Sequence, residues 1–449
     1  MTGSTGLDLT DVQGVVVRGY RMPHARHLLL RVDDPAPARA FLGSLVDDGG
    51  PLQVTTGEPW TQPPECCLNV SVTYAGLQAL GVPSRSLDTF PEEFVAGAVA
   101  RADRVGDVGP SAPEQWMPVF RDPGLHVLVH LFGRSPPAVD HAADDLVARS
   151  AGALSELWRL KAAVLDEERR VEHFGYVDGI SQPSIESAPP TEPPDRLRIS
   201  PAGMFLLGHP SQWSGGPGHP PFTYPVPWPE TLGRNGSFAA FRVLAQDVGA
   251  YLELLAREAG RTGLTEELIA AKLCGRWRDG TPLVLSPDTA TSLPFDRLND
   301  FDYSQDPRGL ACPIGSHVRR MNPRGSKVAG GRPDKRRIVR RALTYGPRYD
   351  PHRPDDVERG ILGLFIGVSL CDQFEFLMAE WANDGLFAAG LGRSKDPLTG
   401  AQDEAGGTLA VPLAGRRETL TGLPRLVTTR GGAYTFIPSI SAIRHLAGV

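Results

Sequence analysis

The segment FGYVDGISQP, from Phe174 to Pro183, places one carboxylate between two glycines in a stretch that is otherwise apolar or uncharged. Gly175 and Gly179 allow tight or positive-φ backbone and let a bulky planar group approach closely. Asp178 is the only residue of the run that exchanges a proton near neutral pH. An isolated Asp-Gly pair is typical of a turn, but this run is much longer than a turn requires. We therefore expect Asp178 to face a bound group.

A second distinctive segment surrounds one of the eleven histidines. Most of these histidines lie in ordinary surroundings, such as His126 and His130 in an apolar run with strand character. A lone histidine without ligand spacing is a weak sign of a metal site. His317 differs because it lies within CPIGSHVRRMNPR, from Cys312 to Arg324.

Both segments resemble motifs of the dye-decolorising peroxidases. The first is similar to the Gly-x-x-Asp-Gly signature, whose aspartate lies on the distal, peroxide-binding side of haem, and the second to the block around the proximal haem histidine. A third segment, IVRRALTYG at 338–346, resembles the stretch whose first arginine reaches the distal pocket, which is Arg340 here. A fourth, RGIL at 359–362 followed by QFEF at 373–376, also matches. With weaker matches on both sides, the resemblance covers nearly the whole chain.

The resemblance implies a role for each of these residues. His317 would bind the iron of haem b, and its neutral imidazole would leave the opposite position open. Asp178 would move the proton of hydrogen peroxide, and Arg340 would stabilise charge on the leaving oxygen. Further contacts to the cofactor are expected from Gly175, Gly179 and Arg324. The implied activity is reduction of hydrogen peroxide and one-electron oxidation of dyes and phenolic compounds through a ferryl intermediate.

Some positions depart from the family pattern or remain undecided. Gly363 stands where relatives commonly carry a phenylalanine over the iron, which would widen the pocket unless Phe365 fills it. Bulky donors are not expected to reach the iron, and Trp381 is a candidate electron relay, although a buried core tryptophan is the simpler interpretation. The sequence does not identify the carboxylate expected to orient His317, for which there are three candidates: Glu375, Glu380 and Asp384.

The composition limits the class of protein. A chain of 449 residues with 41% hydrophobic residues can bury a large core, and its length suggests two domains or one enlarged domain. The net charge of −6 argues against a general nucleic-acid binder, although residues 319–341 are strongly basic. That basic run is expected to be a solvated face, with one or two arginines pairing with haem propionates. The expected small partners are hydrogen peroxide and aromatic donors, and a homo-oligomer is left open.

Other sequence features concern the compartment of the protein. No apolar run is long enough to span a bilayer, and residues 1–6 lack the features of a secretory signal. The five cysteines show neither metal-site spacing nor a disulfide framework. We therefore expect a cytoplasmic protein that does not bind membranes.

Periodicity alone predicts an α+β protein, with two domains favoured. Strands are expected at 26–32, 68–72, 126–132, 205–207, 237–244 and 360–368, and helices at 37–45, 136–164, 248–259, 266–273 and 373–383. The resemblance implies more: two ferredoxin-like domains, 1–196 and 197–449, each an antiparallel sheet with peripheral helices, with haem mainly in the second.

Two other function classes remain open. The chain could be a haem-binding or iron-recovering protein with little peroxidase turnover, which a slow reaction with one equivalent of peroxide would indicate. It could also be a binding protein without haem that has kept the fold. A missing Soret band after expression with adequate haem would support that alternative.

Overall fold

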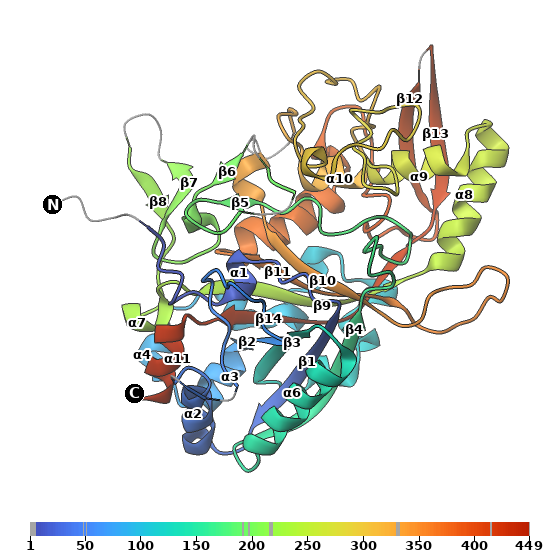
Figure 1. The fold of residues 1–449 in the computed structure, drawn as a ribbon. Coiled ribbons are helices and arrows are strands. Elements are labelled where there is room, and N and C mark those ends of the chain that lie inside the picture. The colour runs from blue at the N-terminus through green and yellow to red at the C-terminus, as the bar shows by residue number, and fades with distance from the viewer. Residues whose placement is uncertain are drawn as a thin grey trace.

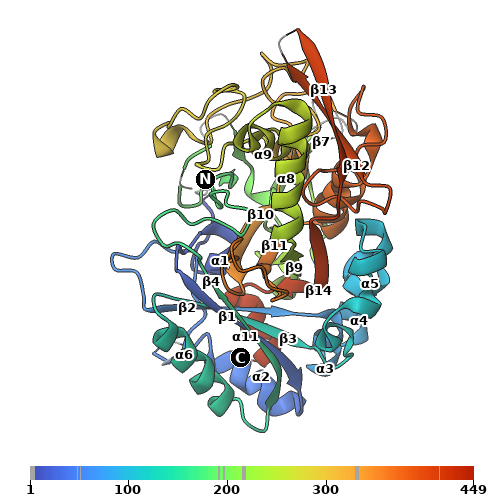
Figure 2. The ribbon, with the colours of Figure 1, turned by 90° about the vertical axis from the view of Figure 1, so that its right-hand side faces the viewer.

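The computed structural model describes residues 6–47, 49–50, 52–190, 193–195, 198–214, 219–328, 333–413 and 415–448. Its centre is an eight-stranded sheet with the order β10-β11-β9-β14-β2-β3-β1-β4, in which neighbouring strands are antiparallel. In Figure 1, α2 and α6 lie below this sheet, whereas α8, α9 and α10 lie above it with the long loops. Figure 2 shows the same separation from the side.

The first half of the sheet belongs to one ferredoxin-like unit. Its elements are β1 (His24–Val32), α2 (Pro35–Ser44), β2 (Cys66–Val72), β3 (Val127–Gly133), α6 (Pro136–Arg149) and β4 (Leu154–Ala163). In the sheet, the fourth strand lies next to the first, followed by the third and the second. This order is that of a split β-α-β pair.

The second half repeats the same strand order. Its main elements are β9 (Ser237–Gln246), α8 (Val248–Thr262), β10 (Val339–Tyr345), β11 (Gly360–Gly367), the helical segments η8 (Leu370–Glu375) and η9 (Leu377–Ala382), and β14 (Val427–Ile437). The two halves join where Phe436 of β14 pairs with Val72 of β2. The predicted α+β class with two ferredoxin-like units is confirmed. The predicted boundary between residues 196 and 197 lies outside the described residues.

Further elements connect and cover the two units. The helices are α1 (Gly14–Val17), α3 (Tyr74–Ala79), α4 (Ser84–Leu87), α5 (Glu92–Ala100), α7 (Glu230–Gly233), α9 (Glu266–Cys274), α10 (His317–Met321) and α11 (Ile440–Ala447). The short strands are β5 (Ser184–Ile185), β6 (Ile199–Ser200), β7 (Pro210–Ser214), β8 (Pro221–Thr223), β12 (Gly407–Leu413) and β13 (Arg416–Leu423). Although α11 ends the chain, it packs against α2 of the first unit.

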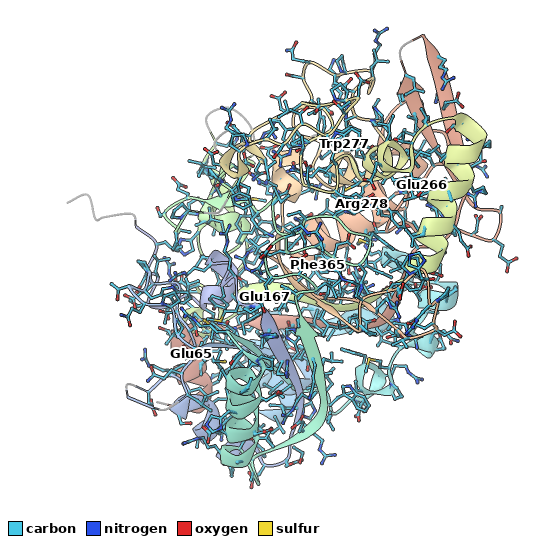
Figure 3. All side chains as sticks on the ribbon, turned by 45° about the vertical axis from the view of Figure 1, so that its right-hand side comes forward. Glu65, Glu167, Glu266, Trp277, Arg278 and Phe365 are labelled. Carbon is cyan, nitrogen blue, oxygen red and sulfur yellow. The ribbon has the colours of Figure 1, made fainter. Side chains whose placement is uncertain are left out.

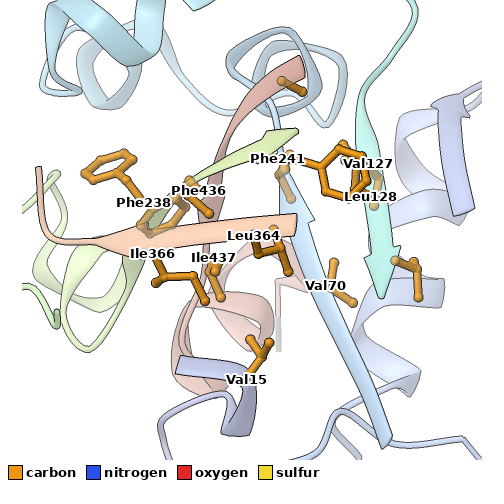
Figure 4. Packing of buried hydrophobic residues seen from close by; sticks show 14 of the residues in the cluster. Val15, Val70, Val127, Leu128, Phe238, Phe241, Leu364, Ile366, Phe436 and Ile437 are labelled. Carbon is orange, nitrogen blue, oxygen red and sulfur yellow. The ribbon is translucent and has the colours of Figure 1, made fainter. Parts of the chain in front are cut away.

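The largest apolar cluster crosses the junction between the two units. Side chains from both units meet in it, as Figure 4 shows for Val70 and Val127 of the first and Phe238, Leu364 and Phe436 of the second. Burial of apolar surface on this scale is the main favourable contribution to folding. The two units therefore share a core.

Two of the predicted elements are wrong. The helix expected over 136–164 ends at Arg149, because Gly152 adopts φ 81 and the chain then turns into β4, which pairs with β1. The strand expected at 205–207 is a buried turn after a short helical segment, and the amide of Leu207 donates to the carbonyl of Gly236. No helix in the described ranges combines the length and apolarity needed to cross a bilayer.

Candidate active site

A cavity of about 1050 Å³ lies above the second unit's half of the sheet, and residues of both halves of the chain line it. The lining residues include Asp178, Gly179, His317 and Arg340. Asp178 and Arg340 meet at this cavity although they lie 162 positions apart in the sequence. The four residues come from a hairpin, the start of α10 and β10. Gly175 and Arg324 do not line the cavity.

His317 is the first residue of α10, which buried polar contacts hold in place. Directly before it, the hydroxyl of Ser316 donates to the carbonyl of Lys272 at 2.5 Å. Arg320, fully buried, donates to the carbonyls of Trp381 and Ser394. The helix position of His317 is therefore fixed by neighbouring segments rather than by this short helix alone.

The carboxylate behind His317 is Asp396. Its Oδ2 lies 2.9 Å from Nδ1 of His317, and its Oδ1 accepts from the amides of Leu398 and Thr399. Burial acts to raise the pKa of Asp396, but the nearby His317 and these hydrogen bonds outweigh it, so the pKa lies below its ordinary value. An ionised Asp396 holds the proton of His317 on Nδ1 and leaves Nε2 to bind a metal.

None of the three candidates from the sequence fills this position. Glu375 is buried but pairs with Arg101 and Arg104. Asp384 accepts from the amide of Leu386, and Glu380 is exposed. Asp396 was missed because it lies 79 positions from His317 and no periodicity links the two residues.

Asp178 stands at the base of a hairpin. Its amide donates to the carbonyl of Arg170 at 3.0 Å, and Val171 and Val177 form a bridge above it. Asp178 is exposed and lines the cavity. The glycines beside it have φ 93 at position 175 and φ 79 at position 179, which glycine adopts without strain.

The tip of the hairpin is held by the buried carboxylate of Glu172. It accepts from the amides of Phe174 and Tyr176, both at 2.9 Å, and from the side chain of Gln246 on β9 at 2.5 Å. Tyr176 also bonds to Tyr251 of α8 through their hydroxyls, at 2.6 Å. The hairpin is thus tied to the second unit, and Gly175 serves its turn rather than the cavity.

Arg340 and Arg341 point to opposite faces of β10, as consecutive strand residues do. Arg340 shares the face of its partner Phe365 on β11, and its amide donates to the side chain of Gln182 at 3.1 Å. Arg341 is bound to the carbonyls of Val15 and Val16, and burial lowers its pKa to about 10. Both arginines line the cavity, and the guanidinium of Arg341 also holds α1.

The distal wall is partly closed over Gly363. A Cβ at this position would lie 3.3 Å from the ring of Phe365 and 3.5 Å from Cβ of Ala342. The ring of Phe365 therefore leans over the glycine instead of leaving open space there. Figure 3 shows Phe365 near the centre of the molecule, with Arg278 and Trp277 above it. Of the two alternatives, filling by Phe365 is the one observed.

Much of the basic segment is internal, so the expectation of a solvated face is wrong for most of its arginines. Arg319 pairs with Asp306, and Arg337 pairs with Asp195. Arg324 is buried, donates to the carbonyls of Asn299 and Phe301, and has its pKa lowered by burial to about 9. This placement does not support Arg324 as a contact to a ligand in the cavity.

Trp381 is fully buried and packs in an aromatic cluster. Its ring centroid is 5.5 Å from that of Phe376 and 5.8 Å from that of Phe387, and it does not line the cavity. Leu377 and Met378, in the same helix, do line it. Trp381 is therefore near the site but does not itself reach the molecular surface.

Comparisons with known proteins point to a single family. The family description "DyP dimeric alpha+beta barrel domain" matches residues 53–165. A dye-decolorizing peroxidase of Mycena epipterygia is 30% identical over 98% of this chain and 87% of its own length. A multifunctional dye peroxidase of an Amycolatopsis species is 29% identical over 99% of this chain and 97% of its own.

Solved structures of the same kind superpose along the whole chain. A dye-decolorizing peroxidase in complex with 2,6-dimethoxyphenol has a TM-score of 0.82 and 26% identity, over 98% of this chain and 100% of the other. A fungal peroxidase of this type from Auricularia auricula-judae has a TM-score of 0.83 and 25% identity, over 99% and 100%. Sequence and fold together show that this chain belongs to the dye-decolorising peroxidases, a family of haem enzymes.

Proposed function

We propose that this peroxidase holds haem b in the cavity through Nε2 of His317 and reduces hydrogen peroxide with Asp178 and Arg340. Organic donors, including small phenols, would then be oxidised in one-electron steps. The observation that carries the proposal is that His317, whose Nδ1 Asp396 engages, lines the same cavity as Asp178 and Arg340.

The residues of the cavity fit a haem group. The volume of about 1050 Å³ is at the upper end of what ligand pockets provide. Because Asp396 engages Nδ1 of His317, Nε2 is the nitrogen left for iron. When bound, haem supplies the redox centre for peroxide reduction and donor oxidation.

Two other groups that line the cavity would handle the proton and the charge. A carboxylate oxygen of Asp178 would take a proton from hydrogen peroxide in the cavity and would return it to the oxygen that leaves as water. The guanidinium of Arg340 would stabilise the negative charge on that oxygen. The hairpin bonds of Glu172 keep Asp178 at its position during these transfers.

Absorption spectroscopy tests the proposal. The purified protein should show a Soret band, and one equivalent of hydrogen peroxide should change the spectrum within the mixing time or soon after. His317→Ala should lose stable haem or change the spectrum. A Soret band that hardly responds to peroxide would favour a haem-binding protein, and an unaltered spectrum in His317→Ala would overturn the assignment of the ligand.

The second part of the proposal is that the protein oxidises small aromatic donors. The structural neighbour that contains 2,6-dimethoxyphenol suggests that phenols of this size are accepted by the fold. Phenol oxidation that depends on hydrogen peroxide and stops in His317→Ala would support it. No oxidation of 2,6-dimethoxyphenol by a protein that reacts with peroxide would contradict it.

A further inference from the structure

A second cavity, of about 440 Å³, lies where the two ends of the central sheet meet. β10 and β4 are the outermost strands in the sheet order, yet they contact each other, and the hydroxyl of Thr344 on β10 donates to the carbonyl of Ala163 on β4. Both residues line this cavity, called here the seam pocket. It shares no lining residue with the cavity around His317.

Basic side chains gather in the seam pocket. The described residues that line it include His24, Arg26, Lys161 and Arg348, and none of them is acidic. Arg26 on β1 and Lys161 on β4 are direct register partners, an arrangement in which like charges are destabilising. Pro136, the first residue of α6, lines the pocket as well, and the positive end of a helix dipole favours an anion.

One carboxylate serves both cations of this register pair. Asp140 of α6 accepts from Nε of Arg26 at 2.6 Å and from Nη2 at 2.9 Å, so both of its oxygens are engaged. The hydrogen bonds of Arg26 first, and the charge of Lys161 with less effect, hold the pKa of Asp140 below its ordinary value. Lys161 is exposed, and no described residue forms a hydrogen bond or ion pair with its ammonium.

Arg348 has a weak partner. Its Nη2 lies 3.9 Å from Oδ2 of Asp166, whereas Arg169 donates to the same oxygen at 3.1 Å. The side chain of Arg348 is exposed, and exposed pairs of such geometry contribute little to stability. The next acids along the chain, Glu167 and Glu168, are exposed and do not line the pocket. The seam pocket therefore has more positive than negative charge around it.

We propose that the seam pocket binds a small molecule through a phosphate group. Lys161 and Arg348 would contact the phosphate oxygens through charge-assisted hydrogen bonds, and Arg26 would add its charge from behind. His24 would donate from its ring, which has no hydrogen-bond partner among the described residues. Cations from three separate segments suit a multivalent anion better than a single carboxylate.

The size of the seam pocket agrees with an organic phosphate. Its volume of about 440 Å³ exceeds the space that a bare phosphate ion needs and falls within the range of small-ligand pockets. The remainder of such a molecule would lie against Pro136 and Pro347, which also line the pocket.

Anion titrations of the purified holoprotein at constant ionic strength test the proposal. Calorimetry and the shift of the melting temperature are measured with inorganic phosphate, pyrophosphate and acetate, since a ligand that binds the folded state raises its stability. Pyrophosphate should bind most tightly and acetate most weakly. Lys161→Gln and Arg348→Gln should each weaken pyrophosphate binding about tenfold, the effect of losing one charge-assisted contact.

Three control variants make the test specific. Lys161→Arg and Arg348→Lys keep the charge and should retain most of the affinity for pyrophosphate. Arg353→Gln removes an exposed arginine that does not line the pocket, and it should leave this affinity unchanged.

Three results would overturn the proposal. The first is that pyrophosphate gives neither heat nor a shift of the melting temperature in wild type. The second is equal affinity in wild type, Lys161→Gln and Arg348→Gln. The third is an equal loss of affinity in Arg353→Gln, which would indicate general attraction by surface charge. Reaction with hydrogen peroxide should be unchanged in Lys161→Gln, so the fate of the seam pocket is decided separately from that of the proposed function.

Discussion

At the scale of single residues, Asp396 decides how His317 can bind iron. Asp396→Asn keeps the size of the side chain but removes the charge that favours a proton on Nδ1 of His317. Loss of such a partner typically costs about 10- to 100-fold in metal affinity or activity. We expect a faster transfer of haem from this variant to apomyoglobin and a higher reduction potential, because the imidazole becomes a weaker electron donor.

A matched control is Glu380→Gln, which neutralises an exposed carboxylate that the sequence also allowed as the partner of His317. Glu380→Gln should leave the rate of haem transfer to apomyoglobin and the reduction potential unchanged. Equal rates of haem loss and equal potentials in Asp396→Asn and wild type would show that Asp396 does not act on the ligand.

The distal pair gives a second prediction. Asp178→Asn and Arg340→Leu should retain haem, since neither residue is the proposed ligand, but should react with hydrogen peroxide more slowly by about 10² or more. Stopped-flow absorbance under excess peroxide measures the rate constant. Rates within a few-fold of wild type in both variants would remove the pair from the mechanism.

The neighbouring cation Arg341 serves as the comparison for Arg340. It lies on the other face of β10, and its guanidinium binds the carbonyls of Val15 and Val16. Arg341→Leu should therefore lower stability by leaving these carbonyls unpaired, with the peroxide rate of the folded protein little changed.

At the scale of the elements, the hairpin that carries Asp178 depends on one buried side chain. Glu172 accepts three hydrogen bonds, and Glu172→Gln offers one acceptor oxygen in place of two. One buried donor would be left unpaired, at a cost of about 1–3 kcal/mol in the free energy of unfolding. The peroxide reaction should slow as well, because Asp178 is held less firmly.

Urea unfolding and stopped-flow rates measure these two effects. The control is Glu168→Gln, at an exposed position shortly before the hairpin. It should change neither the free energy of unfolding nor the rate of the peroxide reaction. Unchanged stability of Glu172→Gln would mean that the hairpin holds its shape without this carboxylate.

The elements also show what the sequence could predict. Strands with long apolar runs, such as 237–244 and 360–368, were located because their composition and length are typical of buried strands. β4 was joined to the preceding helix because its half-buried residues, LSELWRLKAA, give no clear apolar face, and its state is decided by pairing with β1. Tertiary pairing of this kind overrides local preference.

The residues of the candidate site also differ in whether the sequence could predict them. Asp178, His317 and Arg340 were predicted because each lies in a segment with an unusual local sequence, and all three line one cavity. Asp396, Glu172 and Gln246 were not, since each acts through a side-chain hydrogen bond to a distant segment. Arg324 was predicted from its place in the motif, and the sequence does not show that its guanidinium donates to interior carbonyls.

At the scale of the whole molecule, the shared core of the two units contains a pair of neutral histidines. Nδ1 of His27 lies 3.0 Å from Nδ1 of His130, and Nε2 of His130 lies 2.9 Å from the hydroxyl of Ser71. Burial lowers the pKa of His27 to about 3 and that of His130 well below its ordinary value. An ordinary histidine has a pKa of about 6.5.

This difference predicts a specific loss of stability in acid. Below about pH 6.5 the unfolded chain binds protons at both histidines, whereas the folded protein does not until the pH approaches 3 for His27. The free energy of unfolding should therefore fall with decreasing pH through that window, by up to about 1.4 kcal/mol per pH unit for each histidine. Above pH 6.5 both states are neutral and this contribution to the slope vanishes.

Urea midpoints between pH 4 and pH 8 would measure the slope in wild type and in the double variant His27→Leu/His130→Leu. The variant should lose the part of the slope that the two histidines cause, even if its stability near pH 8 is lower. His352→Asn removes an exposed histidine and should keep the wild-type slope. An identical pH dependence in the double variant and wild type would mean that His27 and His130 do not cause the loss of stability in acid. The next groups to test would then be the ion pairs near the cavity, such as His317 with Asp396.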